Sequence, residues 1–292
     1  MGAKIEAQRL KFVQTHQTEL RADSHKGVSE AISSKDTNPT ALGKMVVLPA
    51  TFHGSARHLH SLYQDSMARV RHFGKPTLFC TMTCSPDWPE FEQLMWGKDT
   101  GETAWQRPDV VTRVWELRKK QFLHDVLVTG VLGEVAAYSW VVEFQKRGLP
   151  HLHMLLMTKH NSPRLHTPDD YDTAVCAEIP DPEKFEELHK IVQKHMIHGP
   201  CGPLNPKAPC MENGVCTKNF PKDFTPQTRA NESSYPEHRR RDNGRTVTLK
   251  SGTKLGNEWV VPYNPHLLQK YRCHLNVEVC CSVTGVRHCT LQ

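Results

Sequence analysis

Two strand-like runs joined by a short polar turn constrain the fold of this chain more than any other feature. Residues 135–144 (VAAYSWVVEF) are rich in β-branched and aromatic side chains, and residues 151–157 (HLHMLLM) are almost wholly apolar. The linking residues QKRGLP contain the glycine and proline that are typical of a turn. The sequence therefore predicts an antiparallel hairpin whose second strand lies in the core of the protein.

The second run of this hairpin carries His151 and His153. Side chains at these positions of a strand point to the same face, so the two imidazoles lie together while Leu152 points into the core. This arrangement could chelate one divalent cation with a third ligand from the partner strand. Glu143 is the first candidate for that ligand, and Gln145 is the alternative. A metal held in this way can polarise a phosphodiester oxygen.

Hydrophobic periodicity places further elements along the chain. It predicts a helix that begins after Ser55, helices over 108–129 and 185–197, strands at 77–83, 246–249 and 258–262, and a helix or strand around 266–280. A second His-x-His pair, His58 and His60, falls on the first of these helices. Side chains at that spacing diverge on a helix, so we do not expect this pair to share a metal.

Residues 195–245 are rich in Gly, Pro and Cys and are expected to be irregular. This segment contains five potential metal ligands: His195, His198, Cys201, Cys210 and Cys216. Four of the five could form a tetrahedral zinc site that stabilises a segment with little core of its own. The alternative is a set of unligated thiols with a histidine at a helix end. A disulfide is not expected, because the N-terminus carries no secretory signal.

The same segment is basic and aromatic. Its cations alternate with the rings of Phe220, Phe224 and Tyr235, and they include Lys218, Lys222, Arg229, Arg239, Arg240, Arg241 and Arg245. Such a pattern suits single-stranded DNA, because cations follow the phosphates and rings stack on the bases. The alternative interpretation is an ordinary solvated surface loop.

Composition excludes several classes of protein. Basic residues outnumber acidic ones by 37 to 31, a net charge of +6 that suits a polyanionic partner without requiring one. No apolar run approaches the ~18–20 residues that a membrane span needs. The chain also has no GxxxxGK[ST] phosphate-binding loop. We therefore expect an intracellular protein that is neither secreted nor held in a membrane and that has no ATPase site of this type.

Residues 143–153 (EFQKRGLPHLH) closely resemble the HUH segment of Helitron transposases, the eukaryotic rolling-circle transposons. Further strings resemble the same family: residues 48–90, HMIHGPCG (195–202), CMENGVCTKNFPK (210–222) and VVPYNPHLLQKYRCHLNVEVC (260–280). The resemblance covers roughly residues 42–292. It implies an α+β Rep-type HUH endonuclease domain with a central antiparallel sheet flanked by helices. Residues 1–41, which are polar and weakly periodic, are expected to form a poorly ordered leader with at most a frayed helix.

The resemblance also implies a chemistry. His151 and His153 carry over as ligands of Mg²⁺ or Mn²⁺, the partner is single-stranded DNA, and the location is the nucleus or the cytoplasm. Lys146 and Arg147, in the hairpin turn, are additional phosphate-binding candidates. In this family a tyrosine attacks a DNA phosphate and forms a phosphotyrosine bond. Since a phenol has a pKa of ~10, the metal has to neutralise phosphate charge for that attack.

The sequence departs from the family at the nucleophile. The two expected tyrosine positions, carried forward from Cys280, read His288 and Gln292, and residues 281–292 contain no tyrosine. Tyr271, or Tyr263, is a weak substitute. The helicase domain that follows in full transposases is also missing from this sequence, so we expect a chain truncated before its catalytic tyrosines.

Three functional hypotheses follow. The first is a domain that binds single-stranded DNA and a divalent metal without efficient nicking. The second is an active DNA-nicking endonuclease that uses a non-standard tyrosine or belongs to a longer gene product. The third is a degenerate transposon remnant with a folded core and no function. A covalent adduct between protein and DNA separates the second hypothesis from the other two, and DNA binding separates the first from the third.

Overall fold

The structure is a computed structural model of residues 1–292. It describes residues 2–17, 19, 46–94, 103–144, 148–159, 165, 167–229, 236–249 and 251–280. The chain divides into two compact units, the first formed by residues 1–67 and the second by residues 68–290. Among the described residues, no helix combines the length and the apolar character that a membrane crossing requires.

The first unit contains helix α1 (Gly2–Thr15) and most of helix α3 (Ala56–Phe73). The side-chain amide of Gln17 donates to the carbonyl of Val47 and accepts from its N–H, so the segment after α1 is bonded to the segment that leads to α3. The Ser55 hydroxyl accepts from the N–H of His58, which confirms the predicted start of this helix. The predicted helical setting of the His58–His60 pair is confirmed as well.

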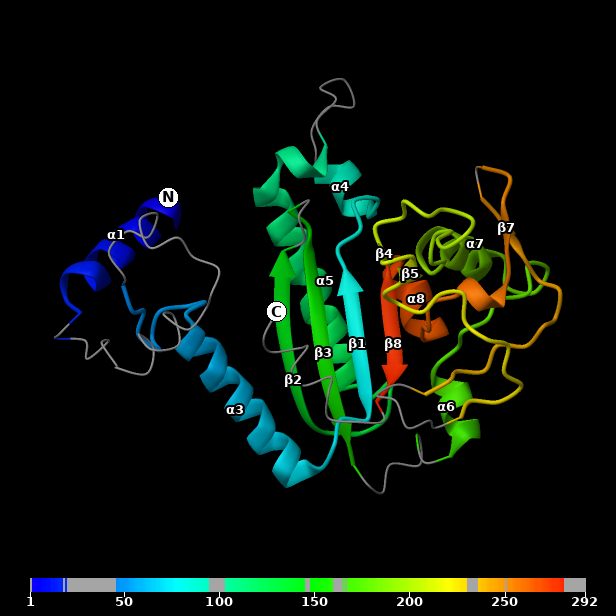
Figure 1. Ribbon diagram of the computed structural model, residues 1–292, viewed down its shortest axis with the longest axis horizontal. Helices are drawn as coiled ribbons and strands as arrows, with labels where there is room; N and C mark the ends of the chain where they lie inside the picture. The colour runs from blue at the N-terminus through cyan, green and yellow to red at the C-terminus, as the bar shows by residue number, and fades with distance from the viewer. Residues whose placement is uncertain are drawn as a thin grey trace. The chain divides into compact units, whose positions relative to one another are not determined.

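The second unit is built on a four-stranded antiparallel sheet in the order β2-β3-β1-β8. The strands are β1 (Leu78–Thr83), β2 (Val135–Phe144), β3 (Pro150–Thr158) and β8 (Leu275–Val279). The predicted hairpin is confirmed as β2 and β3. Figure 1 shows the first strand, β1, lying beside the last strand, β8, although they are far apart in the sequence.

One face of this sheet is apolar. Alternate residues of β3, namely Leu152, Met154 and Leu156, are fully buried and belong to the same hydrophobic core as Phe122 and Val126 of α5 (Pro108–Leu127). Figure 1 shows α5 running behind the sheet. Because side chains alternate along a strand, the opposite face carries the residues between them, including both histidines of β3.

Short elements complete the second unit. They are α4 (Pro89–Leu94), η2 (Ala104–Gln106), α6 (Pro168–Ala174), α7 (Glu186–His195), β4 (Met211–Glu212), β5 (Val215–Cys216), β6 (Val247–Thr248), β7 (Lys254–Leu255), η3 (Asn257–Trp259) and α8 (Pro265–Tyr271). The segment between α7 and β6 contains only the two-residue strands β4 and β5 among its described residues, as expected for an irregular segment.

The prediction of a strand at 258–262 is wrong. Residues 257–259 form the 3-10 turn η3, and the partner of β6 is instead β7. The Asn257 amide explains the difference, because its oxygen accepts from the N–H of Ile179 and its nitrogen donates to the carbonyl of Arg241. The helix or strand expected around 266–280 proves to be both, α8 and then β8, separated by Arg272 in a left-handed conformation (φ 47°).

Candidate metal centres beside the sheet

The face of the sheet opposite the apolar core carries Glu143, His151 and His153, and we call it the polar face. It brings the predicted HUH residues together. In the strand register, Glu143 of β2 pairs with His151 of β3, which pairs in turn with Thr83 of β1. Glu143 Oε2 lies 3.2 Å from Nε2 of His153, and the rings of His151 and His153 are 4.5 Å apart. Both histidines are buried, with exposed fractions of 9% and 6%.

Hydrogen bonds orient the two imidazoles. Thr83 Oγ1 lies 2.7 Å from Nδ1 of His151, and this contact orients the ring. Burial lowers the pKa of His153, the positive charge of Lys218 adds to this effect, and Glu143 opposes it. The net direction favours the neutral imidazole, which is the form that binds metals.

The carboxylate of Glu143 is also suited to bind a cation. Its Oε1 atom is buried and has no hydrogen-bond partner among the residues that the structure describes. Two imidazole nitrogens and a carboxylate form a donor set suited to a divalent ion. Gln145, Lys146 and Arg147 lie outside the described residues, so the alternative ligand and the two turn cations have no structural account.

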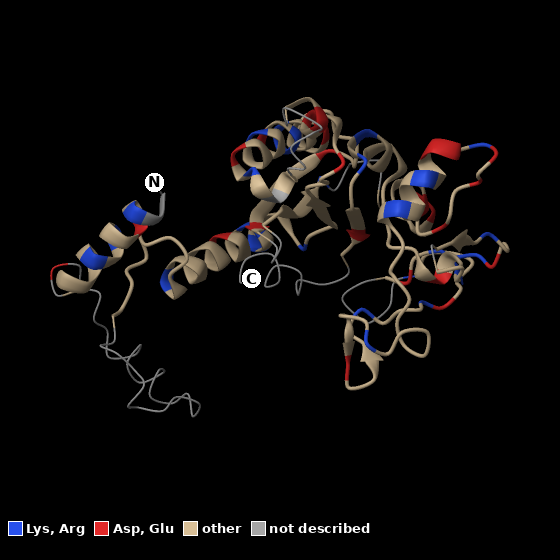
Figure 2. Cartoon of the chain, turned by 90° about the horizontal axis from the view of Figure 1, so that it is seen from above, with Lys and Arg blue, Asp and Glu red and all other residues tan. Residues whose placement is uncertain are grey.

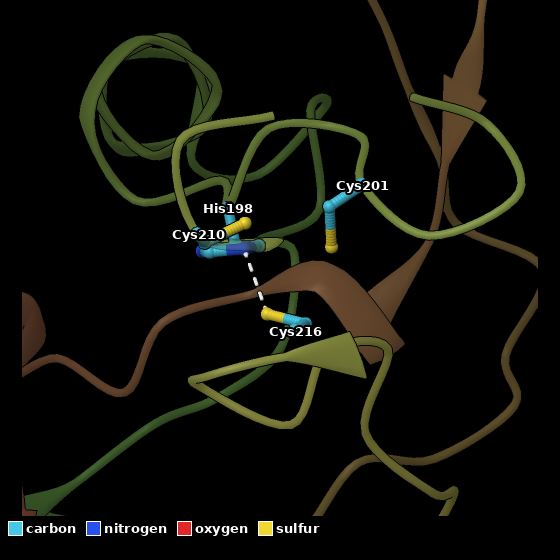
Figure 3. A group of neighbouring side chains, drawn as sticks. All are labelled: His198, Cys201, Cys210 and Cys216. Carbon is cyan, nitrogen blue, oxygen red and sulfur yellow. Dashed lines mark hydrogen bonds between the residues drawn. The ribbon is translucent and has the colours of Figure 1, made fainter. Parts of the chain in front are cut away.

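A second candidate centre lies in the irregular segment. Ligand atoms of His198, Cys201, Cys210 and Cys216 all lie within 4.8 Å of one another, and Figure 3 shows these side chains brought together from separate segments of the chain. Cys216 Sγ is 3.5 Å from Nε2 of His198. Within the described part of the chain, this is the one group of three or more His, Cys, Asp or Glu side chains placed so that they could hold a metal ion together. His195, the last residue of α7, is not part of it.

The three consecutive arginines have structural partners. Arg240 is buried (4% exposed) and donates to the carbonyls of His238 and Val260. Arg241 makes two charge-assisted hydrogen bonds to Glu178. Arg239 lies 3.2 Å from a carboxylate oxygen of Asp172. Figure 2 shows basic and acidic residues interspersed along the segments around the sheet.

These contacts change the interpretation of the arginines. Arg240 is only 4% exposed and so offers little surface to DNA, and Arg239 and Arg241 are engaged by the buried carboxylates of Asp172 and Glu178. Both acids were missed by sequence reasoning. Asp172 follows two other acids, Asp169 and Asp170, and Glu178 lies between Ala177 and Ile179, so no local pattern marks either acid as the partner of an arginine.

The two lysines of the segment lie differently. Lys218 is exposed, and Lys222 is half-buried with its ammonium 5.2 Å from the centre of the Phe220 ring. Burial raises the pKa of Glu278 on β8, and the charges of Lys222 and Lys218 oppose that rise. These lysines therefore act electrostatically on the polar face of the sheet.

The substitute tyrosines are poorly placed as nucleophiles. Tyr271 is fully buried, and its hydroxyl donates to Asp125 at 2.7 Å. Burial, with this hydrogen bond to a carboxylate, strongly raises the pKa of Tyr271. Tyr263 is buried too and donates to the carbonyl of Glu178. Positions His288 and Gln292 lie outside the described residues.

An antiparallel sheet with a helix on one face, paired histidines on the other and a Cys/His cluster nearby defines an α+β protein with candidate metal centres. The chain matches the family of the Helitron helicase-like domain at the N-terminus over residues 1–156, and it belongs to that family. The matched range includes Glu143, His151 and His153, whereas the Cys/His cluster follows it. No curated protein matches the chain.

Proposed function

We propose that the polar face of the sheet is an HUH-type site that binds a divalent cation, Mg²⁺ or Mn²⁺, and a single strand of DNA. Glu143, His151 and His153 would hold the cation. The contact between Glu143 and His153 carries this proposal, because it places a carboxylate next to two imidazoles within a chain of the Helitron family.

Each residue of this site has a distinct task. Thr83 orients His151, and Glu143 orients His153 while offering a second carboxylate oxygen. Lys218 and Lys222 provide positive charge beside the face, which attracts a phosphate backbone. The bound metal would supply charge neutralisation at a phosphodiester.

Binding without efficient nicking is the activity that the described residues support best. Nicking needs a nucleophile that can reach the phosphate. The side chains of Tyr263 and Tyr271 are buried, and their hydroxyls donate to the carbonyl of Glu178 and to the carboxylate of Asp125. The hydroxyl of a tyrosine buried in this way cannot reach a DNA strand bound on the polar face of the sheet without local unfolding.

DNA-binding titrations test the proposal. A labelled single-stranded oligonucleotide would be titrated with the protein in Mn²⁺ and in EDTA, using fluorescence anisotropy. We expect tighter binding in Mn²⁺ and loss of that difference in His151→Ala and His153→Ala. The matched control is His58→Ala with His60→Ala, which removes a His-x-His pair from helix α3.

Two outcomes would contradict the proposal. If the protein binds the oligonucleotide equally tightly in Mn²⁺ and in EDTA, and the β3 substitutions do not change this, the metal has no role in DNA binding. A covalent protein–DNA band on a denaturing gel, abolished by His151→Ala, would instead show an active nuclease.

A further inference from the structure

The Cys/His cluster has the chemistry of a structural zinc site. Three sulfur atoms and one imidazole nitrogen are the donor set that Zn²⁺ prefers in closed tetrahedral centres. Cys201 and Cys216 are buried, and Cys210 is partly buried. All three are free thiols. Sulfur atoms this close and unbonded are well suited to sharing one cation.

The local backbone is shaped for such a site. The N–H of Lys218 donates to Sγ of Cys216 at 3.4 Å, a contact that stabilises a thiolate. Gly202, directly after Cys201, and Asn219 both have positive φ (63° and 54°), so the chain turns tightly beside two of the ligands. Described strands here are only two residues long, and a segment with so little regular structure needs another source of stability.

The cluster is also connected to the lysines that lie beside the sheet. The ring of His198 stacks on that of Phe220 at 4.2 Å, and Phe220 in turn lies under the ammonium of Lys222. Cys201 Sγ contacts the carbonyl of Phe220. Lys218 follows Cys216 by two residues, and the charges of Lys218 and Lys222 act on Glu278 of β8, which pairs with Phe79 of β1 in the sheet.

We propose that His198, Cys201, Cys210 and Cys216 bind one Zn²⁺, and that this zinc holds the loop 216–222 so that Lys218 and Lys222 face the polar side of the sheet. The zinc site stands on the cluster alone. The role of the lysines rests on the proposed function, since it assigns them to the phosphates of the bound strand.

Metal analysis tests the first part. Protein purified without chelators would be measured for zinc by mass spectrometry, and a sample stripped of metal would be reloaded with Co²⁺ for absorption spectroscopy. We expect about one zinc per chain and the intense charge-transfer absorption of thiolate-bound Co²⁺. Cys216→Ser should lower the zinc content severalfold. Cys176→Ser, at a free cysteine outside the cluster, should retain it.

Reloading with Co²⁺ uses the unsubstituted chain, so the test remains valid even if Cys216→Ser fails to fold. Absence of zinc together with absence of the thiolate absorption would overturn the site. Equal zinc content in Cys176→Ser and Cys216→Ser would overturn the assignment of the ligands.

DNA binding tests the second part. Each phosphate contact contributes about 0.7 to the slope of log affinity against log salt for a single strand. Lys218→Gln with Lys222→Gln should therefore reduce that slope by about 1.4 while zinc content stays unchanged. Removal of zinc from the unsubstituted protein should reduce the slope similarly.

The outcomes separate this inference from the proposed function. An unchanged slope in both the lysine variant and the zinc-free protein would overturn the positioning role and leave the DNA site standing. If the unsubstituted protein binds no single-stranded DNA, the proposed function and the lysine role fail together, while the zinc measurement still decides the cluster.

Discussion

Glu143 of β2 contacts His153 of β3, although the strand register pairs Glu143 directly with His151. The contact is therefore diagonal across the hairpin, with 3.2 Å between Oε2 and Nε2. His151 is left to Thr83, which reaches it from β1 on the other side. Each histidine thus has its own orienting partner from a different strand, and both imidazoles remain on one face.

Removal of the carboxylate charge should weaken metal binding. In Glu143→Gln we expect Mn²⁺ affinity to fall on the order of 10–100-fold, because the amide is a poorer cation ligand and no longer pairs with His153 in the same way. Titration of Mn²⁺ followed by electron paramagnetic resonance measures this. Glu134→Gln, at an exposed residue paired with Lys159, is the control. Unchanged affinity in Glu143→Gln would exclude this residue as a ligand.

Thr83 should affect metal affinity indirectly, because it orients the ring of His151 and does not itself bind the metal. Thr83→Val keeps the shape of the side chain and removes its hydroxyl, so His151 loses the partner that orients its ring. We expect Mn²⁺ affinity to fall about 10-fold with the far-ultraviolet circular dichroism unchanged. A variant that binds Mn²⁺ as tightly as the unsubstituted protein would show that the hydrogen bond has no orienting role.

Tyr271 should contribute to stability. Its hydroxyl donates to Asp125, which also pairs with Lys270 at 2.6 Å. Tyr271→Phe should lower the free energy of unfolding by about 1–3 kcal/mol, measured by urea denaturation, with single-stranded DNA affinity unchanged. If the protein forms a covalent DNA adduct and this substitution abolishes it, Tyr271 is the nucleophile and its structural role is secondary.

Acid should weaken the fold through Glu178. Burial alone would raise the pKa of Glu178, but hydrogen bonds and charge from Arg241, with the charge of Arg239, outweigh burial and lower it. A carboxyl whose pKa is lower in the folded protein stabilises the fold above its unfolded pKa. That stabilisation is lost as the pH falls through the folded value.

The test compares Glu178→Gln with the unsubstituted protein in unfolding experiments between about pH 7 and pH 3, the range in which ordinary carboxyls titrate. We expect the variant to be less stable at neutral pH and its stability to depend less on pH in the acid range. Parallel pH profiles for the two proteins would contradict the assignment of this stabilisation to Glu178.

Arg240 should behave as a structural residue. Arg240→Met removes donors to the carbonyls of His238 and Val260. We expect a loss of stability of about 1–3 kcal/mol and no change in the salt dependence of DNA binding. The comparison is the variant with Lys218→Gln and Lys222→Gln. For that variant we expect a changed salt dependence of DNA binding and no loss of stability. A changed salt slope in Arg240→Met, without loss of stability, would return this arginine to the DNA-binding surface.

Much of the local structure follows from the sequence. The hairpin was predictable because β-branched and apolar runs flank a Gly/Pro turn, and the shared face of His151 and His153 follows from the alternation of a strand. Helix α5 likewise follows from apolar spacing. The strand predicted at 258–262 was wrong because the Asn257 amide bonds two distant backbone segments, and no local pattern encodes that pairing.

The sequence by itself determined which residues could act: two histidines on one strand, five potential zinc ligands and a set of basic side chains. Only the tertiary structure decided which of them meet. It gathers four of the five ligands, engages the three arginines with carboxylates or carbonyls, and buries Tyr271. The physical reason is range. Periodicity is a property of neighbouring residues, whereas these contacts depend on how distant segments pack and on the burial that packing imposes.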